Sequence, residues 1–232
     1  MFRFSIFLLP LIALLAADDP TWNKPLPEWN ADDALTVLTG SPWVKVVTAS
    51  YVRKLSEAER RDGGNMEAEG ASKGLGTEGL DNLHLFGGKT KNAGSLEPPR
   101  TRLWIRWESA LPVRAAELRA NDTVAPELDG EDYAICIYNL PLAVTGFDMK
   151  VLPENLKRLG SLKLDEKKEV KPSRVLVRPN GSEMATLVYF FPRSLNITNA
   201  VTRIDFSAQV GRIMLHKDFF TAEMQFQNKL AL

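Results

Sequence analysis

The sequence is poor in the side chains that cross-link folds or hold metals. It has one cysteine, Cys136, and two histidines, His84 and His216. A single cysteine excludes an intramolecular disulfide, so the chain has to rely on an apolar core. A zinc site generally needs several histidine or cysteine ligands at set spacings, and we expect no metal and no cofactor from this inventory. His216 is expected to be a polar strand residue on an outer face.

An excess of charge of one sign is also missing, because lysine plus arginine and aspartate plus glutamate are equal at 29 each. A balanced chain lacks the basic patch of a nucleic-acid-binding protein. Long apolar runs are missing as well: no stretch after residue 17 reaches the roughly 20 apolar residues of a spanning helix. We therefore expect no nucleic acid partner and no transmembrane segment in the mature chain.

Catalytic motifs are the third absence. The Gly-x-Ser-x-Gly pattern of a serine hydrolase does not occur. A pair of Cys136 and His216 is disfavoured because the cysteine lies between two isoleucines, whereas reactive thiols occupy electropositive, partly exposed settings. Gly74 to Gly79 formally matches the dinucleotide fingerprint, but no hydrophobic strand precedes it, so the match is attributed to chance. The sequence identifies no catalytic residue.

The N-terminus has the three parts of a secretory signal peptide. Arg3 supplies a positive charge, Phe4 to Leu15 is an apolar run, and Ala16-Ala17 forms a small-residue cleavage site. The run is shorter than a membrane anchor and contains a proline. Residues 1–17 are therefore expected to be removed, which predicts an exported protein, periplasmic or extracellular. The sequence does not determine its oligomeric state.

Residues 18–61 are predicted to form a small helical segment. Asn30 is a candidate N-cap for a helix that ends at Gly40. Ser41-Pro42 suggests a second helix with Trp43, Val47 and Tyr51 on one face. The segment carries Trp22, Trp29 and Trp43, which either dock these helices on the main domain or form a partner-binding surface. Residues 62–99 are glycine-rich and are interpreted as a flexible linker or surface loop.

Residues 100–232 carry the strand signals and are predicted to be the core domain. Tyr133 to Tyr138 is apolar on both faces, as in a central strand. Asn180-Gly181 between two apolar runs predicts a hairpin, and Gly211 predicts a second one. Short helices are expected near Leu111 to Leu118 and from Leu152 to Leu159. These elements favour an α+β fold with a largely antiparallel sheet, and the alternative is a β-sandwich.

Two groups of side chains remain as candidates for function. Arg102, Trp104 and Arg106 alternate with apolar residues along one strand, so they share a face that can receive an acidic or aromatic partner or can meet acids of the chain itself. Asp129, Glu131 and Asp132 cluster in one turn and are the carboxylates that a hydrolase would use. A solvated turn explains the second group without any chemistry.

Three short segments of the sequence carry a resemblance to other proteins: Ser41-Pro42-Trp43-Val44-Lys45, Ile105 to Arg114, and Val188 to Ser194. Together they resemble small exported proteins from acidobacterial genomes. The resemblance implies a bacterial envelope or extracellular location and brings no activity or catalytic residue. We therefore expect a non-catalytic binding or structural protein of the cell envelope, whose partner would be another envelope or extracellular protein; the alternative is a secreted hydrolase that uses carboxylates.

Overall fold

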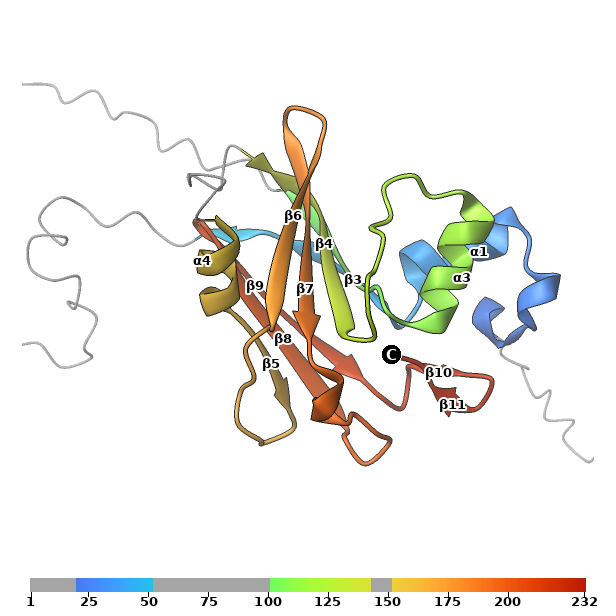
Figure 1. Ribbon diagram of the computed structural model, residues 1–232. Coiled ribbons are helices and arrows are strands. Elements are labelled where there is room, and N and C mark those ends of the chain that lie inside the picture. Colours follow the sequence, from blue (N-terminus) through green and yellow to red (C-terminus); the bar gives the residue numbers. More distant parts are fainter. Residues whose placement is uncertain (1–19, 52–100, 143–151) are drawn as a thin grey trace, which may run out of the picture.

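The computed structural model describes residues 20–51, 101–142 and 152–232 (Figure 1). The expected signal peptide at 1–17 and the whole glycine-rich stretch at 62–99, including Gly74 to Gly79 and His84, lie outside the described residues. Among the helices that are described, none is long and apolar enough to cross a membrane.

A five-stranded antiparallel sheet carries the order β1-β3-β4-β7-β6. Its middle strand is β4, as the run from Tyr133 to Tyr138 predicts, and Cys136 on this strand is buried. Six apolar residues in a row favour this position because both faces of a central strand are covered. The strands span Val44–Thr48 (β1), Arg102–Trp107 (β3), Tyr133–Pro141 (β4), Arg174–Asn180 (β6) and Met184–Phe191 (β7).

A second antiparallel sheet has the order β2-β9-β8-β5. Both predicted hairpins are confirmed: β6 pairs with β7, and β8 pairs with β9. Gly181 and Gly211 occupy the turns with φ of 72° and 58°, the left-handed region that glycine tolerates best. The remaining strands span Ser50–Tyr51 (β2), Gly160–Leu164 (β5), Arg203–Val210 (β8), Ile213–Phe220 (β9), Gln225–Phe226 (β10) and Lys229–Leu230 (β11).

The helices begin where the sequence predicts them. Helix α1 (Ala31–Gly40) has a capping box, in which the Asn30 side chain accepts from the backbone N–H of Asp33 at 2.7 Å. Helices α3 (Leu111–Ala120) and α4 (Leu152–Leu159) are confirmed. Leu111 and Leu118 of α3 are exposed, so they lie on its outer side. Short 3-10 turns span Thr21–Asn23, Leu26–Glu28 and Arg193–Leu195.

The helix expected after Ser41-Pro42 is also wrong, because Val44–Thr48 forms strand β1. β1 pairs along its whole length with β3, from Val44 opposite Arg106 to Thr48 opposite Arg102. Three of the five residues of β1 are valines and the last is a threonine. These β-branched side chains favour a pleated strand over a helix. The N-terminal segment is therefore joined by hydrogen bonds to the sheet of the core.

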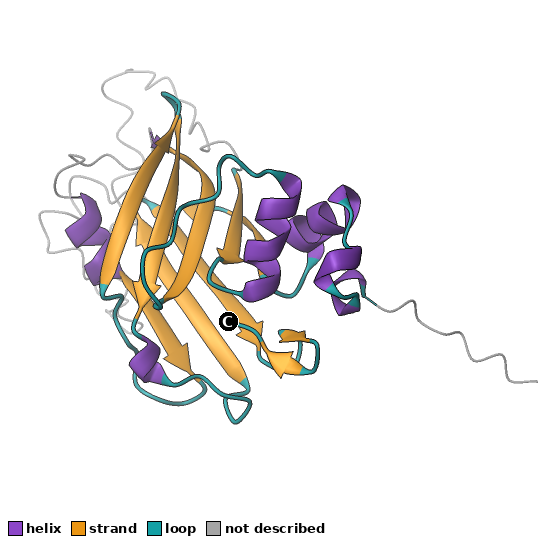
Figure 2. Cartoon of the chain, turned by 45° about the vertical axis from the view of Figure 1, so that its right-hand side comes forward, coloured by secondary structure: helices purple, strands orange, loops and turns teal. Residues whose placement is uncertain are grey.

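The two sheets pack face to face over one apolar core, and Figure 2 shows them as two layers with α1 and α3 beside them. Aromatic rings bridge the layers: Trp107 of β3 meets Phe219 of β9, with ring centroids 5.4 Å apart. Phe206 of β8 meets Tyr189 of β7 at 5.4 Å. The packing of the sheets follows the sandwich alternative, but the helices and short strands make the whole an α+β fold, as predicted.

Gly160 sits where α4 passes into β5, at a point of close contact with the other sheet. A Cβ there would come within 2.7 Å of the Tyr189 ring and 3.1 Å of the Leu156 carbonyl oxygen. Glycine is required here because a larger side chain would collide with the tyrosine ring. Its φ is not positive, so the left-handed conformation that ends many helices is not the reason for this glycine.

The chain also connects the two sheets at one edge. After β1, the chain forms β2, which pairs with β9 of the other sheet. Ala49, which lies between β1 and β2, donates its backbone N–H to the carbonyl oxygen of Thr101 at 2.9 Å. Ala49 and Thr101 are therefore neighbours in the structure, although residues 52–100 lie between them in the sequence.

Candidate functional site

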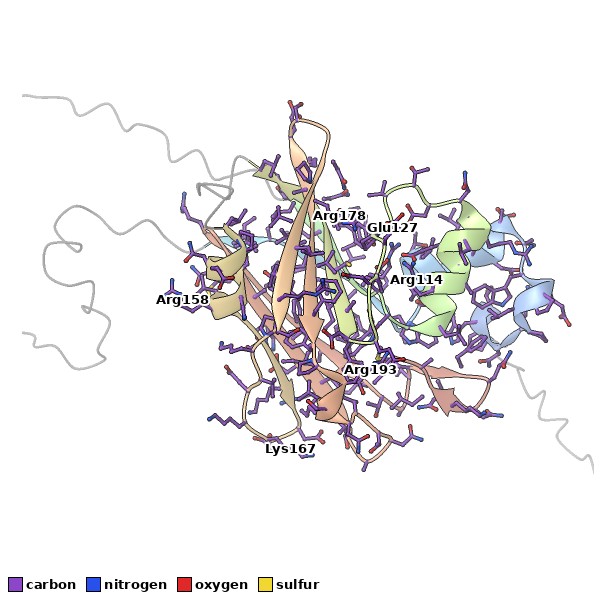
Figure 3. All side chains as sticks on the ribbon, viewed as in Figure 1. Arg114, Glu127, Arg158, Lys167, Arg178 and Arg193 are labelled. Atoms are coloured by element: carbon purple, nitrogen blue, oxygen red, sulfur yellow. The ribbon has the colours of Figure 1, made fainter. Side chains whose placement is uncertain are left out.

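The outer face of the five-stranded sheet, which faces away from the second sheet, is covered by the segment after α3 (residues 121–132; Figure 2). Arginines attach this segment. Arg174 binds the Asp129 carboxylate through both terminal nitrogens, at 3.0 and 2.5 Å. Arg178 donates to the carbonyl oxygen of Glu127 at 3.3 Å, and both residues are labelled in Figure 3. Arg114 donates to the carbonyl oxygen of Pro126 at 3.1 Å. The cover is thus held by charged contacts to β6 and α3.

Beneath this cover lies a buried ion cluster centred on Arg106. Its Nε donates to Glu108 at 2.9 Å, and its Nη2 donates to Glu117 of α3 at 2.7 Å. The Nη2 group also donates to the hydroxyl of Tyr138, and the guanidinium lies 4.3 Å from the centroid of that ring. Tyr138 in turn donates to Glu108 at 2.8 Å. Glu108 has no solvent exposure and Glu117 has 4%, so both acids need these partners.

Burial and mutual proximity shift the protonation of this cluster. Desolvation, together with a hydrogen bond to Glu108 and the charge of that residue, raises the pKa of Glu117 to about 9. Desolvation also raises the pKa of the Tyr138 hydroxyl. Burial acts to lower the pKa of Arg106, but the charges of Glu108, Tyr138 and Glu117 and the hydrogen bond to Glu108 together raise it. The protonation of Glu117 therefore couples folding to pH near neutrality.

We expect Glu117 to make the protein less stable as pH rises. An acid whose pKa is raised by folding keeps its proton in the folded state after the unfolded chain has lost it. Stability is therefore lost between pH 4.5 and about 9, with a slope of up to about 1.4 kcal/mol per pH unit. Because glutamine imitates the protonated acid, urea denaturation of Glu117→Gln should show its advantage over the wild type growing from pH 5 to pH 8. Parallel stability curves for the two proteins would contradict this assignment.

A groove of about 410 Å³ opens beside the cluster, between α1, the start of the cover and the outer face of β3 and β4. Its walls are mostly apolar, and Leu35 and Val124 on them are 57% and 47% exposed. Asn139, at the irregularity where β4 shifts register against β7, has φ of 60°. The groove is lined by Leu35, Leu38, Thr39, Trp104, Arg106, Ala120, Asp122, Val124, Tyr138 and Asn139.

The structure brings two of the three residues of the predicted Arg-Trp face to this groove. Trp104 is half-buried in its wall, and Arg106 lies at its base with 6% exposure. Arg102 is exposed near the start of β3 and is not among the lining residues. Arg106 meets acids of its own chain, which is the second of the two roles the strand pattern left open.

The three tryptophans of the N-terminal segment pack largely inward. Trp43 is completely buried and donates its Nε1–H to the carbonyl oxygen of Ala231 at 2.7 Å. Trp29 is 3% exposed and packs edge-on against Phe226. Trp22 is half-buried, with its ring 6.2 Å from that of Trp43. These contacts attach the segment to the C-terminal strands. Of the two roles considered for the tryptophans, docking and partner binding, they agree with docking.

The turn acids Asp129, Glu131 and Asp132 do not converge on one point. The guanidinium of Arg174 lowers the pKa of Asp129 by hydrogen bonding to its carboxylate. Asp132 accepts from the Ser173 hydroxyl at 3.3 Å, while the Glu131 carbonyl accepts from Arg193. A general acid and base have to face one reacting group, so this arrangement counts against a hydrolase that uses these three acids.

Sequence reasoning did not identify the partners of Arg106. Glu108, Glu117 and Tyr138 are spread over three elements, and only tertiary packing brings them together. One local signal existed: Glu117 follows the apolar Val113 by four residues, so the two lie on the same side of α3, which is buried. An acid on that side requires a basic partner from another element.

No protein-family model matches the chain, and no similar protein is found among curated sequences or solved structures.

Proposed function

We propose that the chain is a non-catalytic binding protein of the cell envelope, and that the groove beside Trp104 takes up a compact, uncharged and largely apolar ligand. The observation that carries this proposal is the groove itself, about 410 Å³ in volume with apolar and aromatic walls. Small-molecule sites commonly occupy about 300–1,000 Å³ and are lined mostly by apolar side chains. The expectation that residues 1–17 direct export supports the envelope location.

The contacts of Arg106 argue for an uncharged ligand. Its Nε and Nη2 groups bind Glu108, Glu117 and Tyr138, and its Nη1 lies 3.4 Å from Asp122. An anion would have to displace these carboxylates from a buried guanidinium, which leaves buried acids unpaired. Affinity then comes from the burial of apolar surface against Trp104, Leu35 and Leu38.

A non-catalytic role fits the protonation chemistry of the described residues. The buried carboxyl pair, Glu108 and Glu117, is engaged with Arg106 and is not part of the groove lining. A catalytic acid has to come within about 3 Å of its substrate. The pair is better explained as the attachment of α3 to the sheet.

Binding of an uncharged fluorescent probe, N-phenyl-1-naphthylamine, tests the proposal. We expect saturable 1:1 binding by the wild type, with increased probe fluorescence. Leu35→Asp should weaken binding by roughly tenfold or more, equal to about 1.4 kcal/mol, because the ligand would bury a carboxylate. Leu35 is well exposed, so the variant should fold normally.

The matched control is Leu118→Asp, which places the same charge on α3 at a residue that is 83% exposed and does not line the groove. Its affinity for the probe should equal that of the wild type. The proposal fails if the wild type shows no saturable binding or if both variants lose affinity equally.

A further inference from the structure

Three potential metal ligands meet on the outer face of the second sheet, far from the groove in sequence and carried by different strands. Along β8, Ile204, Phe206 and Ala208 point into the core, so the residues between them point outward. The antiparallel register places Asp205 opposite Asp218 and Ser207 opposite His216. Side chains directly opposite each other on adjacent strands have Cβ atoms about 4.5–5.5 Å apart. The hairpin therefore gathers two carboxylates, an imidazole and a hydroxyl.

The distances between these groups suit a common ion. His216 Nδ1 lies 3.1 Å from Asp205 Oδ1 and 3.0 Å from Ser207 Oγ. One ligand atom from each of Asp205, His216 and Asp218 lies within 4.8 Å of the other two. Nitrogen and oxygen ligands at about 2.0–2.1 Å from zinc are about 3.4 Å apart in a tetrahedron. Small side-chain rotations bring all three residues to such an ion.

The negative charge at this point is incompletely compensated by the described residues. Oδ1 of Asp218 is buried and has no hydrogen-bond partner, and its nearest cation is Arg203, with Nε at 3.9 Å. Lys163 is opposite Asp205 on β5, but its Nζ pairs with Glu166 at 3.5 Å. Like charges directly opposite each other destabilise a strand pair. A bound cation removes this repulsion.

The same residues do not form a hydrolase triad. In a triad the histidine uses one ring nitrogen for the nucleophile and the other for the orienting carboxylate. Here Ser207 and Asp205 both approach Nδ1 of His216. The imidazole therefore cannot relay a proton between them, and a shared positive centre explains the convergence better.

We propose that Asp205, His216 and Asp218 bind a divalent transition-metal ion, with zinc as the representative. The ion takes the place of the proton between His216 Nδ1 and Asp205 Oδ1, and Asp218 supplies the third ligand. One imidazole and two carboxylates suit zinc and its neighbours, whereas calcium and magnesium prefer oxygen alone. The imidazole side chain is 62% exposed, so water completes the coordination. The ion would link β8 to β9.

Zinc titration of the mature protein by isothermal calorimetry tests the site. We expect one zinc per chain and a rise in thermal midpoint of about 5 °C when free zinc is a hundred times the dissociation constant. His216→Ala and Asp218→Asn should each weaken zinc binding by at least about tenfold. Nitrogen chemical shifts of the His216 ring, recorded by NMR, should change at the same zinc concentration.

The matched control is His84→Ala, which removes the other histidine of the chain and should leave zinc affinity unchanged. His216 is largely exposed, so His216→Ala should keep the metal-free thermal midpoint and any loss of zinc binding reflects ligation. Absence of stoichiometric zinc binding would overturn the proposal, and so would binding of wild-type strength in both His216→Ala and Asp218→Asn.

Discussion

Arg106→Met is expected to cost about 3–5 kcal/mol of unfolding free energy, because it removes the buried cation of the cluster and leaves Glu108 and Glu117 only the half-buried Arg114, whose Nη1 lies 3.7 and 2.5 Å from them. Arg106 joins β3 to α3 through Glu117 and to β4 through Tyr138. Methionine fills much of the same space, so the loss reflects charge and hydrogen bonding more than a cavity. Urea denaturation with a linear extrapolation measures the change.

Arg102→Met is the matched control, since it makes the same change on the same face of β3 at an exposed position. We expect it to alter stability by no more than about 0.5 kcal/mol. Adding Glu108→Gln and Glu117→Gln to Arg106→Met should recover part of the loss, because no carboxylate charge can then form at either buried position. Equal effects at Arg102 and Arg106 would mean that the cluster does not attach α3 to the sheet.

Phe206→Ala is the second large effect, also about 3–5 kcal/mol, because it opens a cavity between the two sheets. The Phe206 ring is completely buried and contacts Tyr189 and Phe191 edge-on, at centroid distances of 5.4 and 6.3 Å. Edge-to-face pairs add to the stabilisation from buried area. Thermal and urea unfolding should both show the loss.

Phe220→Ala on the paired strand β9 removes the same side chain at a position that is 39% exposed. Its cost should be about 1 kcal/mol or less. If Phe220→Ala proved as costly as Phe206→Ala, the face-to-face packing of the sheets at Phe206 would be in doubt.

The hairpins and helix ends were predictable because their signals are local. Asn180-Gly181, Gly211 and the Asn30 capping box each lie within a few residues of the feature they determine. Strand β1 was missed because Ser41-Pro42 is a common helix start, while its true partner, β3, lies beyond residues 52–100. Pairing between distant strands leaves no mark in a short window of sequence.

The candidate site was predictable only in part for the same reason. Alternation placed Trp104 and Arg106 on one face, but whether that face was open depended on α3 and on the cover that follows it. The Asp205, His216 and Asp218 cluster depends on the register of β8 against β9. A shift of that register by one residue would send Asp218 to the other face of the sheet.

The hydrogen bond between Ala49 and Thr101 indicates where this protein tolerates insertions and deletions of sequence. Ala49, which follows β1, and Thr101, which precedes β3, are neighbours, so β1 and β3 pair like the two arms of a hairpin although residues 52–100 lie between them in the sequence. Each doubling of the length of a flexible connection costs only about 0.6 kcal/mol. Length changes, exchanged sequence or a grafted domain at this point should leave the sheets intact, which makes it the natural place for evolutionary divergence and for engineered fusion.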